Sequence, residues 1–257
     1  MNLFDLTGKV AVVTGASGGL GEDAAKAYAQ YGADVAVLAR RKDKLEALAS
    51  EIEKTGRKAL AVECDVTKEE EISHAVDKIL SVYGKMDILL NNAGVAMMGS
   101  VDNTAEEDWD KVMNVNIKGY YLMCKYVIPS MKSRQYGKIV NISSVNALIG
   151  DKPPLMQRHS YNASKAAVLG LTVGMAVTYG ADNITVNAIC PGLFESEMTQ
   201  NTLFKDQNFM EMYEKVNPTG RAGRKGELNG TIIYLSSDAS SYLTGHYITV
   251  DGGLTVV

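Results

Sequence analysis

The fold of this 257-residue chain is decided by the stretch Lys9-Val10-Ala11-Val12-Val13-Thr14-Gly15-Ala16-Ser17-Gly18-Gly19-Leu20-Gly21. Its first half is an apolar, β-branched run that predicts a buried strand over Lys9–Thr14, followed at once by a glycine-rich turn and a helix over Gly21–Tyr31. Glycines there permit a tight turn and a close approach of the backbone to a ligand, and the N–H groups that open the helix attract a pyrophosphate. We therefore predict a dinucleotide-binding turn rather than a flexible loop.

Short β-branched runs alternate with longer segments of helical period along the rest of the chain. The predicted strands are Lys9–Thr14, Asp34–Ala39, Ala59–Cys64, Met86–Leu90, Lys138–Ile142, Ile184–Ile189 and Tyr247–Val250. The predicted helices are Gly21–Tyr31, Asp43–Lys54, Lys68–Tyr83, a long stretch around Glu106–Ser133, Tyr161–Tyr179 and Lys225–Ser236. This alternation favours an α/β fold of Rossmann type, in which a doubly wound, seven-stranded parallel sheet is covered by helices on both faces.

The sequence gives no sign of a boundary between domains. It contains no linker, internal repeat or low-complexity segment, so we expect one domain over residues 1–257. The region Gly192–Asn217 interrupts the alternation and is rich in methionine and aromatic residues. We interpret it as a lid over the substrate, with a helical hairpin that merely packs on the domain as the alternative.

Composition is typical of a soluble globular protein, with 46% hydrophobic and 22% charged residues. The net charge of -4 comes from interspersed acidic and basic residues, which argues against nucleic-acid or membrane partners. Neither a signal-peptide pattern nor a transmembrane run is visible, so we expect a cytoplasmic location. Three distant cysteines, Cys64, Cys124 and Cys190, fit neither a disulfide framework nor a metal site, and we expect no metal.

The end of the second predicted strand bears on which cofactor is bound. NAD enzymes usually place an acidic residue there to hold the ribose hydroxyls, but this chain has Ala39 followed by Arg40 and Arg41. A guanidinium binds a phosphate with two donors, so Arg40 favours NADP(H). We interpret Arg41 as a solvated residue at the start of the next helix that can add a contact. Because Gly18 occupies a place where a basic residue would strengthen this prediction, NAD(H) remains possible.

Tyr161 and Lys165 are suited to proton transfer. Four residues apart on a helix, they share one face, which brings the ammonium near the phenol. A nearby positive charge lowers the pKa of a phenol from about 10 toward the working pH, where it can exchange a proton with a carbinol or carbonyl oxygen. Tyr161 is therefore the expected general acid in reduction and general base in oxidation.

Four further motifs follow the glycine turn. They are Asn91-Asn92-Ala93-Gly94, Asn114-Val115-Asn116-Ile117, Ser143-Ser144 and Tyr161-Asn162-Ala163-Ser164-Lys165. With these motifs and the TGxxxGxG pattern of Thr14 to Gly21, nearly the whole chain resembles the short-chain dehydrogenase/reductase family. The resemblance implies an NAD(P)-dependent enzyme acting on CH–OH groups. A dinucleotide-binding regulatory protein without turnover is disfavoured, because Tyr161 and Lys165 are both present.

The resemblance also implies roles for individual residues. The expected catalytic residues are Asn116, Ser144, Tyr161 and Lys165. The expected cofactor-binding residues are Gly15, Ser17, Gly18, Gly19, Leu20, Gly21, Arg40, Arg41, Asp65, Val66, Asn92, Ala93, Gly94, Tyr161, Lys165, Pro191, Gly192 and Ser196. Three alternatives stay open: Ser143 competes with Ser144, Asn116 can be a satisfied helix amide, and Asp65 can be a turn or helix cap.

Two further features of the sequence bear on the substrate-binding loop and on the assembly of subunits. The interval from Ser144 to Tyr161 is longer than is usual in the family, because the loop from Asp151 to His159 is extended. Near the C-terminus, Asp251-Gly252-Gly253 matches the family's closing strand, which packs at a subunit interface. We expect a homotetramer, although a dimer fits as well.

The substrate is the least determined feature. An apolar set is expected around the nicotinamide: Met97, Met98, Leu148, Leu155, Met156, Phe194, Met198 and Phe204. It favours a hydroxysteroid or a bile-acid-like molecule whose carboxylate meets Arg158 or Lys152. The rival is a sugar acid or polyol, as for gluconate 5-dehydrogenase-like members of the family. Such a substrate would use the polar residues Asn146, Gln157, Arg158, His159 and Glu195.

Overall fold

The chain forms one seven-stranded sheet in the computed structural model, which describes residues 2–151, 156–200 and 203–257. The strands are β1 (Val10–Thr14), β2 (Asp34–Ala39), β3 (Ala59–Glu63), β4 (Ile88–Asn91), β5 (Gly137–Ile142), β6 (Ile184–Pro191) and β7 (Tyr247–Val250). Their order is β3-β2-β1-β4-β5-β6-β7, and every neighbouring pair is parallel. The sequence-based prediction of a doubly wound parallel sheet is confirmed.

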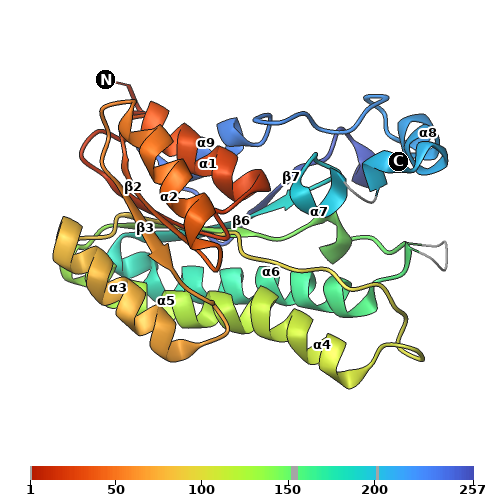
Figure 1. Cartoon of the computed structure of the whole chain (residues 1–257), viewed down its shortest axis with the longest axis horizontal. Helices are drawn as coiled ribbons and strands as arrows, with labels where there is room; N and C mark the ends of the chain where they lie inside the picture. Colours follow the sequence, from red (N-terminus) through yellow and green to blue (C-terminus); the bar gives the residue numbers. More distant parts are fainter. Residues whose placement is uncertain (1, 152–155, 201–202) are drawn as a thin grey trace.

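Helices cover both faces of this sheet (Figure 1). The helices that pack on the sheet are α1 (Gly19–Gln30), α2 (Lys42–Glu53), α3 (Glu69–Tyr83), α5 (Gly119–Arg134), α6 (His159–Tyr179) and α9 (Asn229–Ser236). One apolar cluster joins α1, α2 and α9 to one face, and a second joins α3, α5 and α6 to the other. Successive residues of β1 alternate between the two clusters, since Val12 belongs to one and Val13 to the other.

The long predicted helix Glu106–Ser133 is interrupted. It consists of α4 (Glu106–Met113), a π-helical turn η1 (Asn114–Lys118) and α5. Inside the turn, the Asn116 amide accepts a hydrogen bond from Val95 N at 2.8 Å and donates one to Val95 O at 2.9 Å. Single π-turns are rare inside helices and are frequent at functional sites. Here the turn carries Asn116, and its amide fixes the loop that follows β4.

Several other element boundaries differ from the prediction by one to four residues, and two of the differences have a visible cause. Helix α9 begins at Asn229 instead of Lys225, and Gly226 just before it has a left-handed backbone with φ of +84°. A left-handed residue cannot belong to a right-handed helix, so the first turn is lost. Strand β4 begins at Ile88 instead of Met86, after Asp87, whose backbone and side chain both bond Val10.

The segment predicted as a lid contains α7 (Glu197–Gln200), a short 3-10 turn η5 (Leu203–Lys205) and α8 (Gln207–Val216). The phenol of Tyr213 on α8 is buried and accepts hydrogen bonds from Leu193 N at 3.4 Å and from Asn217 Nδ2 at 3.1 Å. These contacts tie α8 to the chain that leaves β6. Over the described part of the chain, no helix combines the length and apolar character needed to cross a membrane.

Candidate active and cofactor site

The glycine turn after β1 lies directly against the chain that leaves β4. A Cβ on Gly15 would lie 2.8 Å from Ala93 Cα, and Gly15 has a left-handed φ of +66°. A Cβ on Gly21 would lie 2.6 Å from the Gly15 carbonyl oxygen and would also collide with the Asn92 amide. These positions therefore require glycine for close packing of the turn, as the sequence pattern predicted.

Thr14 connects the two segments, and sequence reasoning did not single it out. Its hydroxyl accepts hydrogen bonds from the backbone N–H groups of Asn92 at 3.0 Å and Ala93 at 3.1 Å. The Asn92 amide in turn donates to the carbonyl of Thr14 at 2.9 Å. The Thr of the TGxxxGxG pattern was the available signal, because it is buried at the last position of β1.

The start of α1 can accept an anion. Gly18 is its N-cap residue, and no side chain of the described residues caps the first turn. Arg41 lies over this turn: its guanidinium donates to Ser17 Oγ at 2.8 and 3.0 Å and to Ser17 O at 3.0 Å. Arg41 is exposed, as expected, but it is anchored to the glycine turn and is not merely solvated. The uncapped helix start and the arginine beside it fit the phosphate groups of a dinucleotide.

Asp65 and Arg40 lie near one another at the ends of β3 and β2. The Asp65 carboxylate accepts hydrogen bonds from Thr67 N at 3.0 Å and Thr67 Oγ1 at 2.8 Å, so Asp65 does form a local turn. Burial acts to raise the pKa of Asp65, but the Thr67 bonds and the charge of exposed Arg40 lower it overall. Val66 is buried against Gly119 at the start of α5.

The expected catalytic side chains meet at the carboxyl ends of β5 and β4. Tyr161 lies in the first turn of α6 and is partly buried. The Ser144 hydroxyl after β5 acts to lower the pKa of the Tyr161 phenol. Lys165 follows one turn later on α6, with Nζ 5.6 Å from the centre of the Tyr161 ring. The helical spacing of Tyr161 and Lys165 thus brings the two groups to one face.

The pKa of Tyr161 moves opposite to the expected direction. Burial raises it above its usual value, although the hydrogen bond with Ser144 and the positive charge of Arg158 act to lower it. Lys165 does not produce the expected lowering. Spacing on a helix shows that two groups share a face, but it does not show how strongly each is desolvated.

Lys165 is a buried amine surrounded by neutral groups. Its side chain is 2% exposed, and Nζ donates to the Ile142 carbonyl at 2.8 Å. No carboxylate acts on it among the described residues, and burial lowers its pKa from 10.5 to about 7. Tyr120 on α5 was missed by sequence reasoning: its hydroxyl donates to the same carbonyl at 3.0 Å, and its ring centre lies 5.6 Å from Lys165 Nζ.

Asn116 and Ser143 hold the backbone around the expected catalytic residues. Besides its two bonds to Val95, the Asn116 amide donates to Ser164 Oγ at 3.0 Å, so it is a satisfied amide that links η1 to α6. Ser143 donates through Oγ to the Lys165 carbonyl at 2.7 Å and is buried. Since Ser143 is engaged inside the fold, Ser144 is the serine of the pair that faces the phenol.

The turn after β6 completes the site. A Cβ on Gly192 would lie 2.8 Å from Asp251 Cα, so this glycine allows the end of β6 to pass close to the end of β7. Pro191 is the last residue of β6. Ser196 Oγ and Thr199 Oγ1 are 3.0 Å apart, and Thr199 also donates to the Phe194 carbonyl at 2.7 Å. Thr199 was not predicted, although it lies three residues after Ser196.

The substrate side is more polar than the apolar set predicted. Asn146, Asp151, Arg158 and Asn162 form a hydrogen-bonded group after β5 and at the start of α6. Met98 and Leu148 are exposed. The prediction for Phe194 needs correction, because its side chain is buried in the core and packs where a Cβ on Gly223 would collide with it. Lys152 and Leu155 lie outside the described residues, as does the side chain of Met198.

The fold and this site together define a class of protein. A parallel sheet with a glycine turn after its first strand, next to a Tyr and Lys pair that share a helix face, is typical of enzymes that bind a nicotinamide dinucleotide and act on a CH–OH group. Among the described residues, no group of three or more His, Cys, Asp or Glu side chains is placed to hold a metal ion.

Comparisons with known proteins identify the family. The family model described as short chain dehydrogenase matches residues 9–207, and the chain belongs to this family of oxidoreductases. The gluconate 5-dehydrogenase of Gluconobacter oxydans is 38% identical over 255 residues, which span 99% of this chain and 98% of that protein. The 3-oxoacyl acyl-carrier-protein reductase FabG of Thermotoga maritima is 38% identical over 251 residues, 98% of this chain and 99% of that protein.

A solved structure also resembles this chain along its whole length. The gluconate 5-dehydrogenase of Burkholderia cenocepacia, crystallised with NADP and tartrate, superimposes with a TM-score of 0.94 at 34% sequence identity. The match covers 100% of this chain and 98% of that one. Both the fold and the enzyme class predicted from the sequence are thereby confirmed.

Proposed function

We propose that this chain is an NADP(H)-dependent oxidoreductase that interconverts a secondary alcohol and a ketone, with Tyr161 as the proton-transferring residue. The observation that carries the proposal is the position of the Tyr161 phenol, between Ser144 and the Lys165 side of α6, at the same sheet edge as the glycine turn. Clefts at the carboxyl ends of parallel strands are where such folds bind ligands.

Each catalytic side chain has one task in the proposed reaction. The nicotinamide, when bound, supplies or accepts the hydride. Tyr161 gives a proton to the carbonyl oxygen in reduction and takes it back in oxidation. Ser144 hydrogen-bonds the same oxygen and stabilises the charge that develops on it. Lys165 places its amine, which carries a positive charge when protonated, one helical turn from the phenol, and Asn116 fixes the neighbouring backbone.

A preference for NADP(H) over NAD(H) is supported by two arginines. Arg41 is anchored on the glycine turn, and Arg40 lies close enough to Asp65 to lower its pKa, on the side where the adenosine would lie. A guanidinium matches a 2'-phosphate, whereas an acid at this place would repel it. The solved Burkholderia relative contains NADP. The remaining predicted contacts, from Gly15 to Gly21, Asn92 to Gly94 and Pro191 to Ser196, form the rest of the proposed cofactor groove.

For the substrate we propose a polyhydroxy compound or sugar acid. The polar groups of Asn146, Asp151, Arg158 and Asn162 beside Tyr161 support this class, as does the similarity to two gluconate 5-dehydrogenases. A hydroxysteroid is the second candidate, and the exposed side chains of Met98 and Leu148 support it. The segment 192–217 is proposed to close over either substrate as a lid.

The proposal includes an assembly and a location. We propose a homotetramer, with a dimer as the alternative, because Val173 and Val177 on α6 and Tyr247 on β7 expose apolar surface. The proposed location is the cytoplasm.

The function is tested by assaying NADPH and NADH oxidation with oxo-steroids, keto-sugar acids and small diketones. Wild-type protein is expected to oxidise NADPH with at least one ketone, and Tyr161→Phe should lower this rate by about 10³-fold, since a lost general acid typically costs that much. Tyr126→Phe is the matched control, because Tyr126 is an exposed phenol on α5 bound to Glu69. Undiminished reduction by Tyr161→Phe would refute the assigned role.

A further inference from the structure

A charged cluster lies beside the catalytic residues and has no part in the proton-transfer chemistry. We call Asn146, Asp151 and Arg158 the mouth cluster. Arg158 is the N-cap residue of α6, three positions before Tyr161, and its Nε donates to Asp151 Oδ2 at 2.9 Å. The same oxygen accepts a bond from Asn146 Nδ2 at 3.0 Å. The arginine side chain is 13% exposed, and that of Asp151 is 23% exposed.

The way Arg158 is held leaves one side of its guanidinium available. Asp151 and the Met156 carbonyl, at 3.3 Å, both contact Nε. Within the described part of the chain, no acceptor is bonded to Nη1 or Nη2. These two nitrogens form a planar fork that matches the two oxygens of a carboxylate. A largely buried fork of this kind gains more from an anion than an exposed lysine does, because its plane is already fixed.

The mouth cluster is continuous with the reacting groups. The backbone N–H of Asn146 donates to Ser144 Oγ at 3.1 Å, so the cluster begins at the catalytic serine. At its other end, Arg158 caps α6 three residues before Tyr161, and its positive charge acts to lower the pKa of that phenol. An anion bound at Arg158 would therefore lie next to the oxygen that Ser144 and Tyr161 hold.

We propose that Arg158 is a substrate-binding residue that takes the carboxylate of a keto acid or hydroxy acid, with Asp151 holding the guanidinium in place. This inference rests on the proposed function and narrows it to carboxylate-bearing substrates. A purely structural reading is that the ion pair only ties the loop after β5 to α6. The two readings differ in how the partners of the pair should respond to mutation.

The test compares ketones with and without a carboxylate. Acetoacetate is paired with methyl acetoacetate, and 5-keto-D-gluconate with L-sorbose, which carries CH₂OH in place of the carboxylate. Each is assayed with NADPH for wild-type protein, Arg158→Gln and Asp151→Asn. Wild type is expected to prefer the acid of at least one pair. Arg158→Gln should raise the KM for that acid by about 30- to 100-fold, and its loss of kcat/KM should be at least about tenfold larger for the acid than for the neutral partner.

Asp151→Asn separates binding from loop structure. Asparagine keeps an oxygen that can accept the Arg158 Nε bond and hold the guanidinium in place. Its loss of charge removes a repulsion of the substrate carboxylate, so the KM for the acid should stay unchanged or fall. If both variants lose equal kcat/KM for the acid and for the neutral ketone, the inference is overturned. That result would support the reading in which the ion pair only connects the loop after β5 to α6. Turnover without any preference for acids would also overturn it, while leaving the proposed function intact. Absence of turnover with every ketone would contradict the proposed function itself.

Discussion

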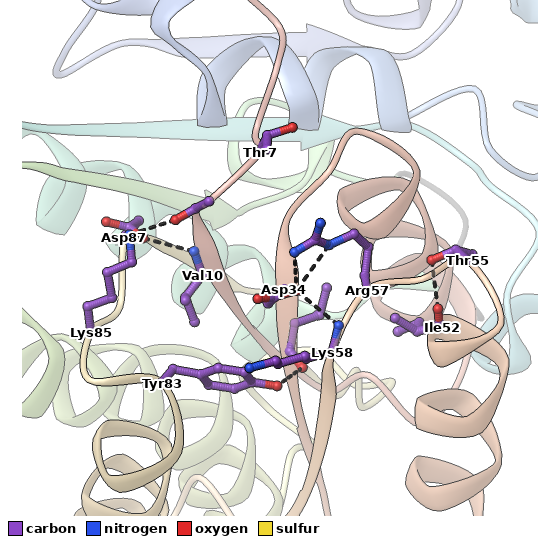
Figure 2. Close-up of polar contacts among 12 residues, drawn as sticks. Thr7, Val10, Asp34, Ile52, Thr55, Arg57, Lys58, Tyr83, Lys85 and Asp87 are labelled. Carbon is purple, nitrogen blue, oxygen red and sulfur yellow. Dashed lines mark hydrogen bonds and ion pairs between the residues drawn. The ribbon is translucent and has the colours of Figure 1, made fainter.

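Charged side chains are buried at both ends of the parallel strands, which we call the amino edge and the carboxyl edge of the sheet. The two edges differ in how the buried charge is compensated. At the amino edge, Asp87 is 2% exposed and accepts Val10 N at 2.8 Å, Lys85 Nζ at 3.1 Å and Arg134 Nη1 at 2.6 Å. Figure 2 shows Asp87 beside Val10, with Asp34 bonded to Arg57 and Lys58 nearby. At the carboxyl edge, Lys165 is buried equally deeply but has the neutral Ile142 carbonyl as its partner.

The difference separates a compensated, structural charge from one that we propose to be reactive. Two cations and a backbone N–H compensate the carboxylate of Asp87, so its burial connects β1, β4 and α5 without leaving a charge unpaired. The Lys165 amine has no such compensation, and its pKa falls to about 7. A buried group with a strongly shifted pKa in a ligand-binding edge is typical of an active site. Mutations at the two edges should therefore separate activity from stability.

The largest expected effect is that of Lys165→Met on activity. Removing the amine should lower kcat/KM by about 10³-fold, since proton transfer at Tyr161 loses the charge beside it. The fold should be kept or stabilised at neutral pH, because an apolar side chain replaces an uncompensated buried amine. Steady-state kinetics and thermal unfolding at one protein concentration measure the two effects. A large loss of stability at pH 7 would contradict the contrast between the edges.

The Lys165→Met variant can also be tested through the pH dependence of its free energy of unfolding. The folded amine has a pKa of about 7 and the unfolded one has 10.5, so between these values the unfolded chain binds a proton that the folded chain has released. Stability contributed by this group therefore rises with pH across that window and is lowest below pH 7. The difference in stability between Lys165→Met and wild type should shrink from pH 7 toward pH 10. A constant difference would show that the amine is not desolvated as described.

Asp87→Asn should produce the converse result at the amino edge. The amide cannot neutralise Lys85 and Arg134, and we expect a loss of about 2 to 3 kcal/mol in the free energy of unfolding. The activity per folded molecule should stay near the wild-type value, because this edge is opposite to the catalytic one. Urea unfolding followed by circular dichroism measures the loss, and active-site kinetics on the folded fraction provide the control. A fall in kcat comparable to that of Lys165→Met would show that the amino edge also affects activity, and the contrast between the two edges would fail.

The sequence predicted the fold and the meeting of Tyr161 with Lys165, because both depend on local periodicity. Alternating strands and helices specify a parallel sheet, and a four-residue spacing on a helix specifies a shared face. Spacing could not predict the anchoring of Arg41 on Ser17 or the shared use of the Ile142 carbonyl by Tyr120 and Lys165. Those contacts join segments distant in sequence. The upward shift of the Tyr161 pKa was missed for the same reason, since burial is a tertiary property.

The smallest expected effect belongs to Asp34→Asn, in the second ion pair of the amino edge. Asp34 Oδ1 accepts Arg57 Nη2 at 2.6 Å and Lys58 N at 2.9 Å, and the two paired side chains are 17% and 29% exposed. Asparagine keeps an oxygen for the Lys58 N–H and loses the charge alone, so about 1 kcal/mol should be lost. Urea unfolding at low and at high salt tests this. The loss should shrink at high salt, because partly exposed charges are screened, whereas the loss in Asp87→Asn should persist since Asp87 is buried. An equal salt response of the two variants would mean that burial does not distinguish these carboxylates.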